Sequence, residues 1–486
     1  LATEMFSSAN KAFTMCPGLT QGAVEAIHAA ASDELKATWL PKMITGEWTG
    51  TMNLTEPQAG SDVGAIRTKA TPQADGSYRI KGQKIFISFG EHDMAENIVH
   101  LVLARTPDAP EGVRGISLFL VPKFLLNEDG SIGQRNDLIC SALEHKLGIH
   151  ASPTAVMSFG DNDGAVGYLV GDENKGLAAM FVMMNMARLA VGIEGVASAE
   201  SALQLATAYA HERRQGSLPT NPTQSVVIAE HADVRRMLML MQSRTRAMRA
   251  MAMVIAEAQD VLDNSSDAQQ RQQKQQFIEL MIPVFKAWAT ESGIDVASLG
   301  LQIHGGMGYV EETGAAQIWR DARISTIYEG TTGIQANDLI GRKLMRDSGE
   351  AFGQLMSQIR ATVADMHSAG LSADAQRLEE AVAALEASAA LILKKGKTGF
   401  MLSQFVSVPF LMMMGHVTGG WLLARCAVAA QSKKDSGEYA ESELTSWLQT
   451  QEFYSRYTLA EVAGMQRQLE NYLGEEANAS LPDIAG

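Results

Sequence analysis

The sequence predicts an α+β protein of several domains, in which a β-rich segment separates helical segments. Hydrophobic residues recur every three or four positions up to about Gly46 and again after Lys175, which is typical of helices. Between Trp48 and about Val170 they alternate or form short β-branched runs, which is typical of strands. A chain of 486 residues has room for about two to four domains of ordinary size.

The first 46 residues are predicted to be the end of an N-terminal helical domain. Helical spacing runs through Gly22–Ala31, and Ser32 and Asp33 are suited to cap a following helix, Glu34–Ile44. The chain starts at Leu1, inside a predicted helix, without an initiator methionine or a cleavage signal. We therefore expect a fragment of a longer protein.

Residues 47–170 are predicted to form a β-barrel-like middle domain. The strongest strand signals lie at Tyr78–Ser88, Ile98–Ala104 and Ile116–Val121, and a turn is expected at Ala74–Gly76.

Residues 171–346 are predicted to form a four-helix-bundle domain, and residues 347–486 an additional helical domain. Long helices cannot bury their faces alone, so we expect antiparallel packing. The helices expected in the bundle are Gly176–Arg214, Val226–Leu262, Ala268–His304, Gly314–Arg323 and Gly333–Met345. Those expected beyond it are Ala351–Ala389, Phe400–Ser432 and Ser442–Leu473.

Charge and composition exclude several classes of function. Lys and Arg total 40 against 55 Asp and Glu, and the resulting net charge of −15 disfavours nucleic acid as a partner. The three cysteines show no metal-binding or disulfide spacing and the ten histidines are scattered, so no metal site and a reducing compartment are expected. Polar residues interrupt the apolar stretch Phe400–Ala430, so we expect a core helix and no stable membrane insertion.

Two segments combine residues suited to ligand chemistry. Thr51–Asp62 brings hydroxyls, glycine and proline into one loop, which is compatible either with a capped turn or with hydrogen bonds to a ligand. Ile327–Gln335 places the carboxylate of Glu329 between apolar residues and a glycine, before a helix that Thr331 or Thr332 could cap. Apolar surroundings raise a carboxyl pKa, so Glu329 is a candidate base.

Taken together and in order, six motifs resemble the acyl-CoA dehydrogenase flavoproteins. They are Thr55–Asp62, Gly82–Ser88, Ala187–Gly192, Glu212–Arg214, Gln302–Gly306, and Arg320–Arg323 followed by Tyr328–Thr331. The region after Asp347 is similar to the extra helical domain of a long bacterial branch that includes 3-methylthiopropionyl-CoA dehydrogenase. Most of the family's N-terminal helical domain is expected to be missing.

The resemblance implies FAD between the β-domain and the bundle, with some contacts made to a neighbouring subunit's FAD. Arg213, Gln302, Gly305 and Gly306 would reach the neighbour's cofactor, and Thr331 that of the same chain. The resemblance assigns the remaining flavin contacts to Met52, Leu54, Thr55, Ser61, Phe86 and Ser88. Sharing of this kind implies a homo-oligomer, and we expect a dimer.

The resemblance also implies that Glu329 removes the α-proton of an acyl-CoA thioester while a β-hydride leaves to FAD. Ser61, Arg188, Tyr328 and Gly330 are the implied substrate contacts, although Arg188 could equally form a supporting salt bridge in the bundle. The expected product is trans-2-enoyl-CoA, from 3-methylthiopropionyl-CoA or a fatty acyl-CoA.

The expected electron acceptor is electron-transfer flavoprotein, and the expected location is the bacterial cytoplasm. Two alternatives stay open: an acyl-CoA oxidase, and a non-catalytic flavoprotein of the same fold.

Overall fold

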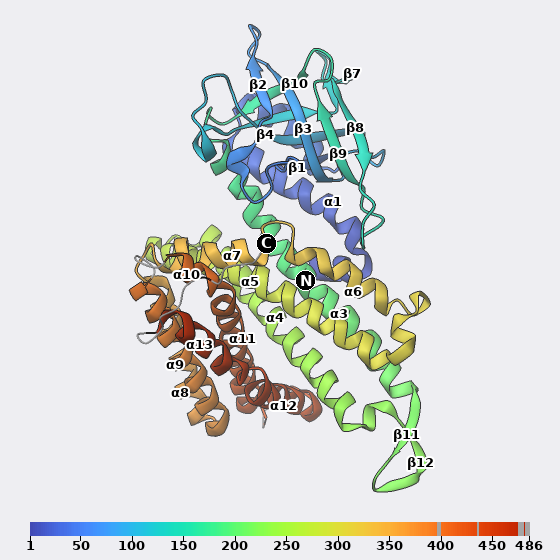
Figure 1. Ribbon diagram of the computed structural model, residues 1–486, viewed down its shortest axis with the longest axis vertical. Helices are drawn as coiled ribbons and strands as arrows, with labels where there is room; N and C mark the ends of the chain where they lie inside the picture. The colour runs from blue at the N-terminus through green and yellow to red at the C-terminus, as the bar shows by residue number, and fades with distance from the viewer. Residues whose placement is uncertain (396–399, 435–436, 475–480, 482–486) are drawn as a thin grey trace. The chain divides into compact units, whose positions relative to one another are not determined.

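The computed structural model describes residues 1–395, 400–434, 437–474 and 481 of the chain (Figure 1). Within it the chain divides into two compact units, Leu1–Ala190 and Val191–Gly486. The division falls inside helix α3 (Gly176–Glu212), which contributes to both units.

The first unit begins with two helices, α1 (Ala2–Ala30) and α2 (Asp33–Ile44). The side chain of Ser32 accepts a hydrogen bond from the Leu35 N–H at 3.3 Å, which confirms the predicted cap. Helix α1 packs closely on strand β1 (Trp48–Asn53), because a Cβ atom at Gly50 would lie 2.5 Å from that of Ala23.

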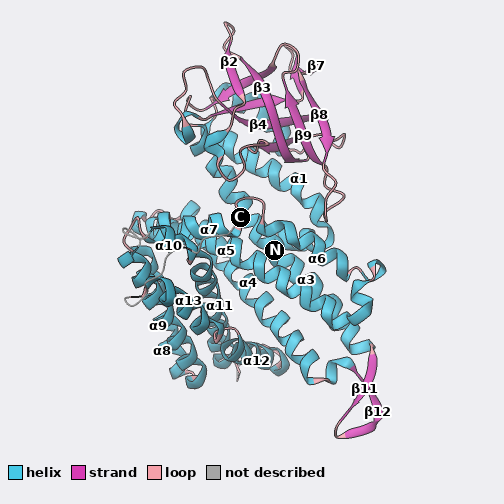
Figure 2. Cartoon of the chain, viewed as in Figure 1, coloured by secondary structure: helices cyan, strands magenta, loops and turns pink. Residues whose placement is uncertain are grey.

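The remainder of this unit is mainly a mixed β-sheet, shown in magenta in Figure 2. The strand order is β1-β4-β5-β10-β3-β9-β8, with β2 paired to β3 and a separate hairpin of β6 and β7. The further bounds are β2 (Lys69–Pro72), β3 (Tyr78–Ser88), β4 (Asn97–Ala104), β5 (Ser117–Pro122), β6 (Phe124–Leu126), β7 (Ile132–Arg135), β8 (Leu138–Leu143), β9 (Thr154–Phe159) and β10 (Ala165–Val170). The three strands predicted most strongly are confirmed as β3, β4 and β5.

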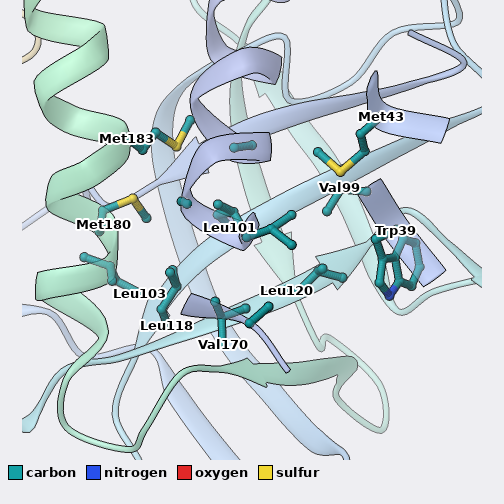
Figure 3. Close-up of a cluster of buried hydrophobic side chains, with 14 of the residues drawn as sticks. Trp39, Met43, Val99, Leu101, Leu103, Leu118, Leu120, Val170, Met180 and Met183 are labelled. Carbon is teal, nitrogen blue, oxygen red and sulfur yellow. The ribbon is translucent and has the colours of Figure 1, made fainter. Parts of the chain in front are cut away.

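One hydrophobic core of this unit lies where α1, α2 and the start of α3 meet the sheet (Figure 3), and a second is formed among the strands, around Ile80, Phe119 and Phe159. Met180 and Met183 of α3 are fully buried in the first of these cores against Leu101, Leu103 and Leu118. Both thioethers therefore contribute to the packing of this core.

The second unit contains the rest of α3, α4 (Ala232–Asn264), α5 (Ala268–His304), α6 (Ala315–Arg323) and α7 (Thr332–Asp338). A hairpin of β11 (Arg214–Leu218) and β12 (Asn221–Val227) separates α3 from α4. The prediction that a helix begins at Val226 is therefore wrong. Pro219 and Pro222 disfavour helix here, and Gly216 has a positive φ of 68° where the pairing of β11 with β12 shifts register.

In the described part of the second unit, six further helices follow: α8 (Glu350–Ser368), α9 (Ser372–Lys395), α10 (Phe400–Phe405), α11 (Ser407–Ser432), α12 (Glu441–Tyr457) and α13 (Glu461–Leu473). The single helix predicted over Ala351–Ala389 is in fact two. Gly370, with a φ of 79°, breaks it between α8 and α9.

Short helices of other types occur in both units. The 3-10 helices are η1 (Val63–Ala65), η2 (Gly112–Gly115), η3 (Ile228–Glu230), η4 (Gly305–Tyr309), η5 (Glu311–Thr313) and η6 (Ile324–Thr326), and η7 (Leu339–Leu344) is a π-helix.

By length and hydropathy alone, α3 and α11 are long and apolar enough to cross a membrane. In α11, 83% of the most apolar window is buried inside the protein, as expected for a core helix; in α3 that share is 39%. The prediction of a core helix over Phe400–Ala430 is thus supported for its α11 portion.

Candidate active site

In the first unit, a buried ion pair anchors the loop that follows β1. The Lys84 ammonium on β3 lies 2.8 Å from a carboxylate oxygen of Glu56, and it also donates to the Leu54 carbonyl at 3.0 Å. Glu56 further accepts hydrogen bonds from the Thr68 hydroxyl at 2.6 Å and the Arg67 N–H at 2.7 Å. Burial acts to raise the pKa of Glu56, but Lys84 and these donors outweigh it and hold the pKa at about 2.

This anchor brings together two segments that carry predicted flavin contacts. The Ile85 N–H of β3 donates to the Thr55 carbonyl at 2.9 Å, which ties the end of β1 to the end of β3. Met52, Leu54 and Thr55 therefore lie beside the segment that carries Phe86 and Ser88.

Phe86 has an unusual backbone for a non-glycine residue. Its φ is 61°, and the pairing of β3 with β9 shifts register between Lys84 and Ile87. The bulge leaves the Phe86 ring 59% exposed at the end of a strand whose neighbouring residues, Lys84 and Ile87, are buried. An exposed aromatic ring held in a sparsely populated conformation marks a candidate ligand surface.

The hydroxyls nearby fit the polar edge of a flavin. Among the described residues, the side chains of Thr55, Ser61 and Ser88 have no hydrogen-bond partner. Hydroxyl groups can both donate and accept, as the mixed donor and acceptor groups of an isoalloxazine ring require. The residues present in this unit therefore suit the predicted cofactor.

In the second unit, Glu329 lies in a tight turn between η6 and α7. Glu329 has a φ of 55° and Gly330 a φ of 89°. The Lys286 ammonium, fully buried on α5, donates to the Gly330 carbonyl at 2.7 Å, and the side-chain amide of Gln335 donates to the Glu329 carbonyl at 3.0 Å. These two contacts hold the turn from α5 on one side and from α7 on the other.

Hydrogen bonds also hold the side chains of the residues on either side of Glu329. The Tyr328 hydroxyl donates to Glu194 of α3, and burial and that carboxylate raise the pKa of Tyr328 well above its usual range. The Thr331 hydroxyl caps α7 by accepting from the Ile334 N–H at 3.3 Å, so Thr331 rather than Thr332 is the cap. Thr332 instead donates to Glu291 of α5.

The remaining predicted cofactor residues of this unit form a second group. Gln302, Gly305 and Gly306 are exposed at the end of α5, and Arg213 is exposed where α3 ends. A Cβ atom at Gly305 or Gly306 would meet nothing within 4 Å, so the surface there is open. Along α5, Gly305 is separated from Glu291, beside the Glu329 turn, by about 20 Å. The structure therefore does not bring this group to Glu329 within the chain.

Arg188 is largely buried on α3 and belongs to the first unit. No group of three or more His, Cys, Asp or Glu side chains in the described ranges could hold a metal ion.

Sequence reasoning missed the residues that hold the Glu329 turn. Lys286 was recognisable from the sequence, because it is a charged residue within the apolar stretch Leu280–Ala289 of a predicted bundle helix. A buried charge needs a polar partner, so this position indicates a specific contact. Gln335 and Glu194 were not recognisable from the sequence, because polar residues on a helix ordinarily face solvent.

Three family models match the chain. They are described as acyl-CoA dehydrogenase, middle domain (residues 51–162), acyl-CoA dehydrogenase, C-terminal domain (residues 174–345), and acetyl-CoA dehydrogenase C-terminal like (residues 355–475).

Similar proteins agree with these matches. The chain is 49% identical to 3-methylmercaptopropionyl-CoA dehydrogenase of Ruegeria pomeroyi, over 99% of this chain and 81% of that protein. It is 36% identical to the broad-specificity linear acyl-CoA dehydrogenase FadE5 of Mycobacterium tuberculosis, over 89% of this chain and 73% of that protein.

Among solved structures, an acyl-CoA dehydrogenase from Bacillus anthracis complexed with FAD shares the fold. Its TM-score is 0.76 at 20% identity, covering 97% of this chain and 77% of that chain.

Proposed function

The chain belongs to the acyl-CoA dehydrogenase family, and from that premise we propose that it oxidises 3-methylmercaptopropionyl-CoA or a fatty acyl-CoA to the trans-2-enoyl-CoA. As a member of this family it is an FAD-dependent oxidoreductase. The thioether substrate is proposed because the Ruegeria pomeroyi relative is a 3-methylmercaptopropionyl-CoA dehydrogenase.

The observation that supports this function is the rigid turn around Glu329. In the proposed reaction the Glu329 carboxylate takes the α-proton, and the β-hydrogen leaves with its electron pair. Bound FAD supplies the acceptor for that hydride. An α-proton is too weakly acidic for a free carboxylate, so the thioester oxygen needs a hydrogen-bond donor where negative charge develops. The Glu329 N–H is proposed as that donor. Gln335 holds the Glu329 carbonyl and Lys286 holds the Gly330 carbonyl, so the two peptides that follow this N–H are fixed.

We also propose that Tyr328, Gly330 and Ser61 contact the substrate. Tyr328 and Gly330 flank the base in the same turn, and Ser61 offers a free hydroxyl in the first unit. For Arg188 we propose a contact with the substrate or a supporting ion pair, as the sequence predicts.

The FAD contacts divide into two sets. Met52, Leu54, Thr55, Ser61, Phe86, Ser88 and Thr331 are proposed to bind the same chain's cofactor. Arg213, Gln302, Gly305 and Gly306 are proposed to bind that of a second subunit. The exposure of the second set and its distance from Glu329 support this division.

We propose that the protein is a homodimer. A mass near four protomers, measured by light scattering, would overturn this proposal.

Electron-transfer flavoprotein is the proposed acceptor, and the cytoplasm the proposed location. An oxidase would use the same base but would produce hydrogen peroxide on turnover in air. Turnover that requires electron-transfer flavoprotein and yields little peroxide supports the dehydrogenase.

The deciding experiment is an anaerobic titration of the FAD-loaded enzyme with 3-methylmercaptopropionyl-CoA, butyryl-CoA and decanoyl-CoA. Dehydrogenation bleaches the oxidised-flavin absorbance, and the thioester with the highest kcat/KM identifies the substrate. Glu329→Gln is expected to slow bleaching by about a hundred- to ten-thousandfold. Glu350→Gln, which changes an exposed glutamate on α8, is the matched control and should bleach normally. Bound FAD that no thioester bleaches would favour the non-catalytic alternative.

A further inference from the structure

The second unit contains a cavity of about 440 Å³ between α4, α11 and α12, partly open to solvent. These three helices pack on one another (Figure 1). Three arginines line the cavity, Arg246 and Arg249 from α4 and Arg425 from α11, and Trp447 of α12 lies beside them. None of these residues belongs to the Glu329 turn or to the predicted cofactor contacts.

Arg246 is held in place before any ligand arrives. It donates to the Thr450 hydroxyl at 2.7 Å and to the Ser446 carbonyl at 3.2 Å, and its guanidinium lies 4.6 Å from the centre of a Trp447 ring. A guanidinium fixed in this way loses little further entropy on binding an anion.

The positive charge in the cavity is only partly compensated. Arg249 pairs with Glu200 of α3. Arg425 lies over the Trp421 ring at 5.4 Å, and within the described part of the chain it has no carboxylate partner. Burial and the nearby Arg249 lower the pKa of Arg246, as expected where cations crowd one another.

The rest of the lining is apolar, and includes Met253, Val254 and Leu422. A pocket of this volume holds a small organic molecule. Apolar walls beside arginines match a ligand that has a hydrocarbon body and an anionic end, because arginine binds carboxylates through two parallel hydrogen bonds.

We propose that this cavity is a binding site for an amphipathic carboxylate, of the class of medium-chain alkanoates. The site is separate from the acyl-CoA chemistry and does not depend on the substrate proposed above.

Equilibrium dialysis of the FAD-loaded protein against labelled decanoate tests this proposal. Saturable binding is expected, with decanol binding at least about tenfold more weakly because it lacks the charge that arginine recognises. Arg425→Gln should weaken decanoate binding by about tenfold or more. Arg456→Gln, which changes an exposed arginine of α12 outside the cavity, is the matched control and should leave it unchanged.

A second variant fills the cavity instead of changing its charge. Ala429→Trp, at an exposed lining residue, should abolish decanoate binding. Flavin bleaching by acyl-CoA should persist in both cavity variants, which separates this site from the proposed active site. Absence of decanoate binding, equal binding of decanol, or unchanged binding in Arg425→Gln and Ala429→Trp would each overturn the proposal.

Discussion

Lys84 and Glu56 form an ion pair that is almost completely removed from solvent, with 0% and 4% of their side chains exposed. The pair joins β3 to the loop after β1, and both segments carry predicted flavin contacts. Removing one partner of a buried ion pair destabilises the folded state strongly, because the other charge is left buried without compensation. Replacing both partners by apolar residues costs much less. The pair therefore links the stability of the β-domain to the shape of the proposed cofactor surface.

Lys84→Met is expected to destabilise the first unit by about 3–5 kcal/mol, because it leaves the Glu56 carboxylate buried without a cation. FAD should also dissociate more readily, because the carbonyl of Leu54 would lose the hydrogen bond from the Lys84 ammonium. Lys81→Met, an exposed lysine on the same strand, should cost less than about 0.5 kcal/mol. Urea unfolding and FAD retention on a desalting column measure the two effects, and similar results for both variants would contradict the role given to Lys84.

His416 gives the stability a specific pH dependence. Its Nδ1 accepts a hydrogen bond from the Trp288 indole at 3.2 Å, and burial lowers its pKa from 6.5 to about 3. The unfolded chain therefore takes up a proton at this histidine before the folded protein does. The contribution of His416 is complete above pH 6.5 and is lost progressively as the pH falls from 6.5 toward 3.

His416→Gln removes the titrating group but keeps an acceptor for Trp288. Between pH 6.5 and 4, the free energy of unfolding of the wild type should fall more steeply than that of the variant, by up to about 1.4 kcal/mol per pH unit. Urea unfolding at several pH values measures the difference. Parallel curves for the two proteins would show that burial does not lower the pKa of His416 in the folded protein.

Regular elements were predictable where local pattern and tertiary packing agree. Strand Tyr78–Ser88 and helix Ala268–His304 have the predicted bounds, and the Asp267 side chain caps the helix by accepting from the Gln269 N–H at 2.9 Å. The β11–β12 hairpin was missed because its strands are short and polar and show no clear alternation.

The Glu329 turn was predictable as a turn, but the contacts that hold it were not. Glycine and threonine after Glu329 predict a chain reversal and a helix start, and Thr331 does cap α7. The Lys286 contact with Gly330 spans 44 residues of sequence, and no local pattern specifies a pairing over that distance.

Gly330→Ala tests the rigidity of the turn directly. With a φ of 89°, residue 330 favours glycine, and an added Cβ would lie 2.5 Å from the Gln335 amide nitrogen that holds the Glu329 carbonyl. We expect a strain of about 1–3 kcal/mol, and a fall in kcat of about tenfold or more because the base is displaced. Gly333→Ala is the matched control, since its nearest neighbour would be 3.9 Å away and alanine suits a helix. Stopped-flow reduction of the FAD-loaded variants by saturating acyl-CoA measures the step itself. If the flavin of Gly330→Ala is reduced at the normal rate, the turn tolerates displacement of the Gln335 side chain. Its hydrogen bonds then do not position Glu329.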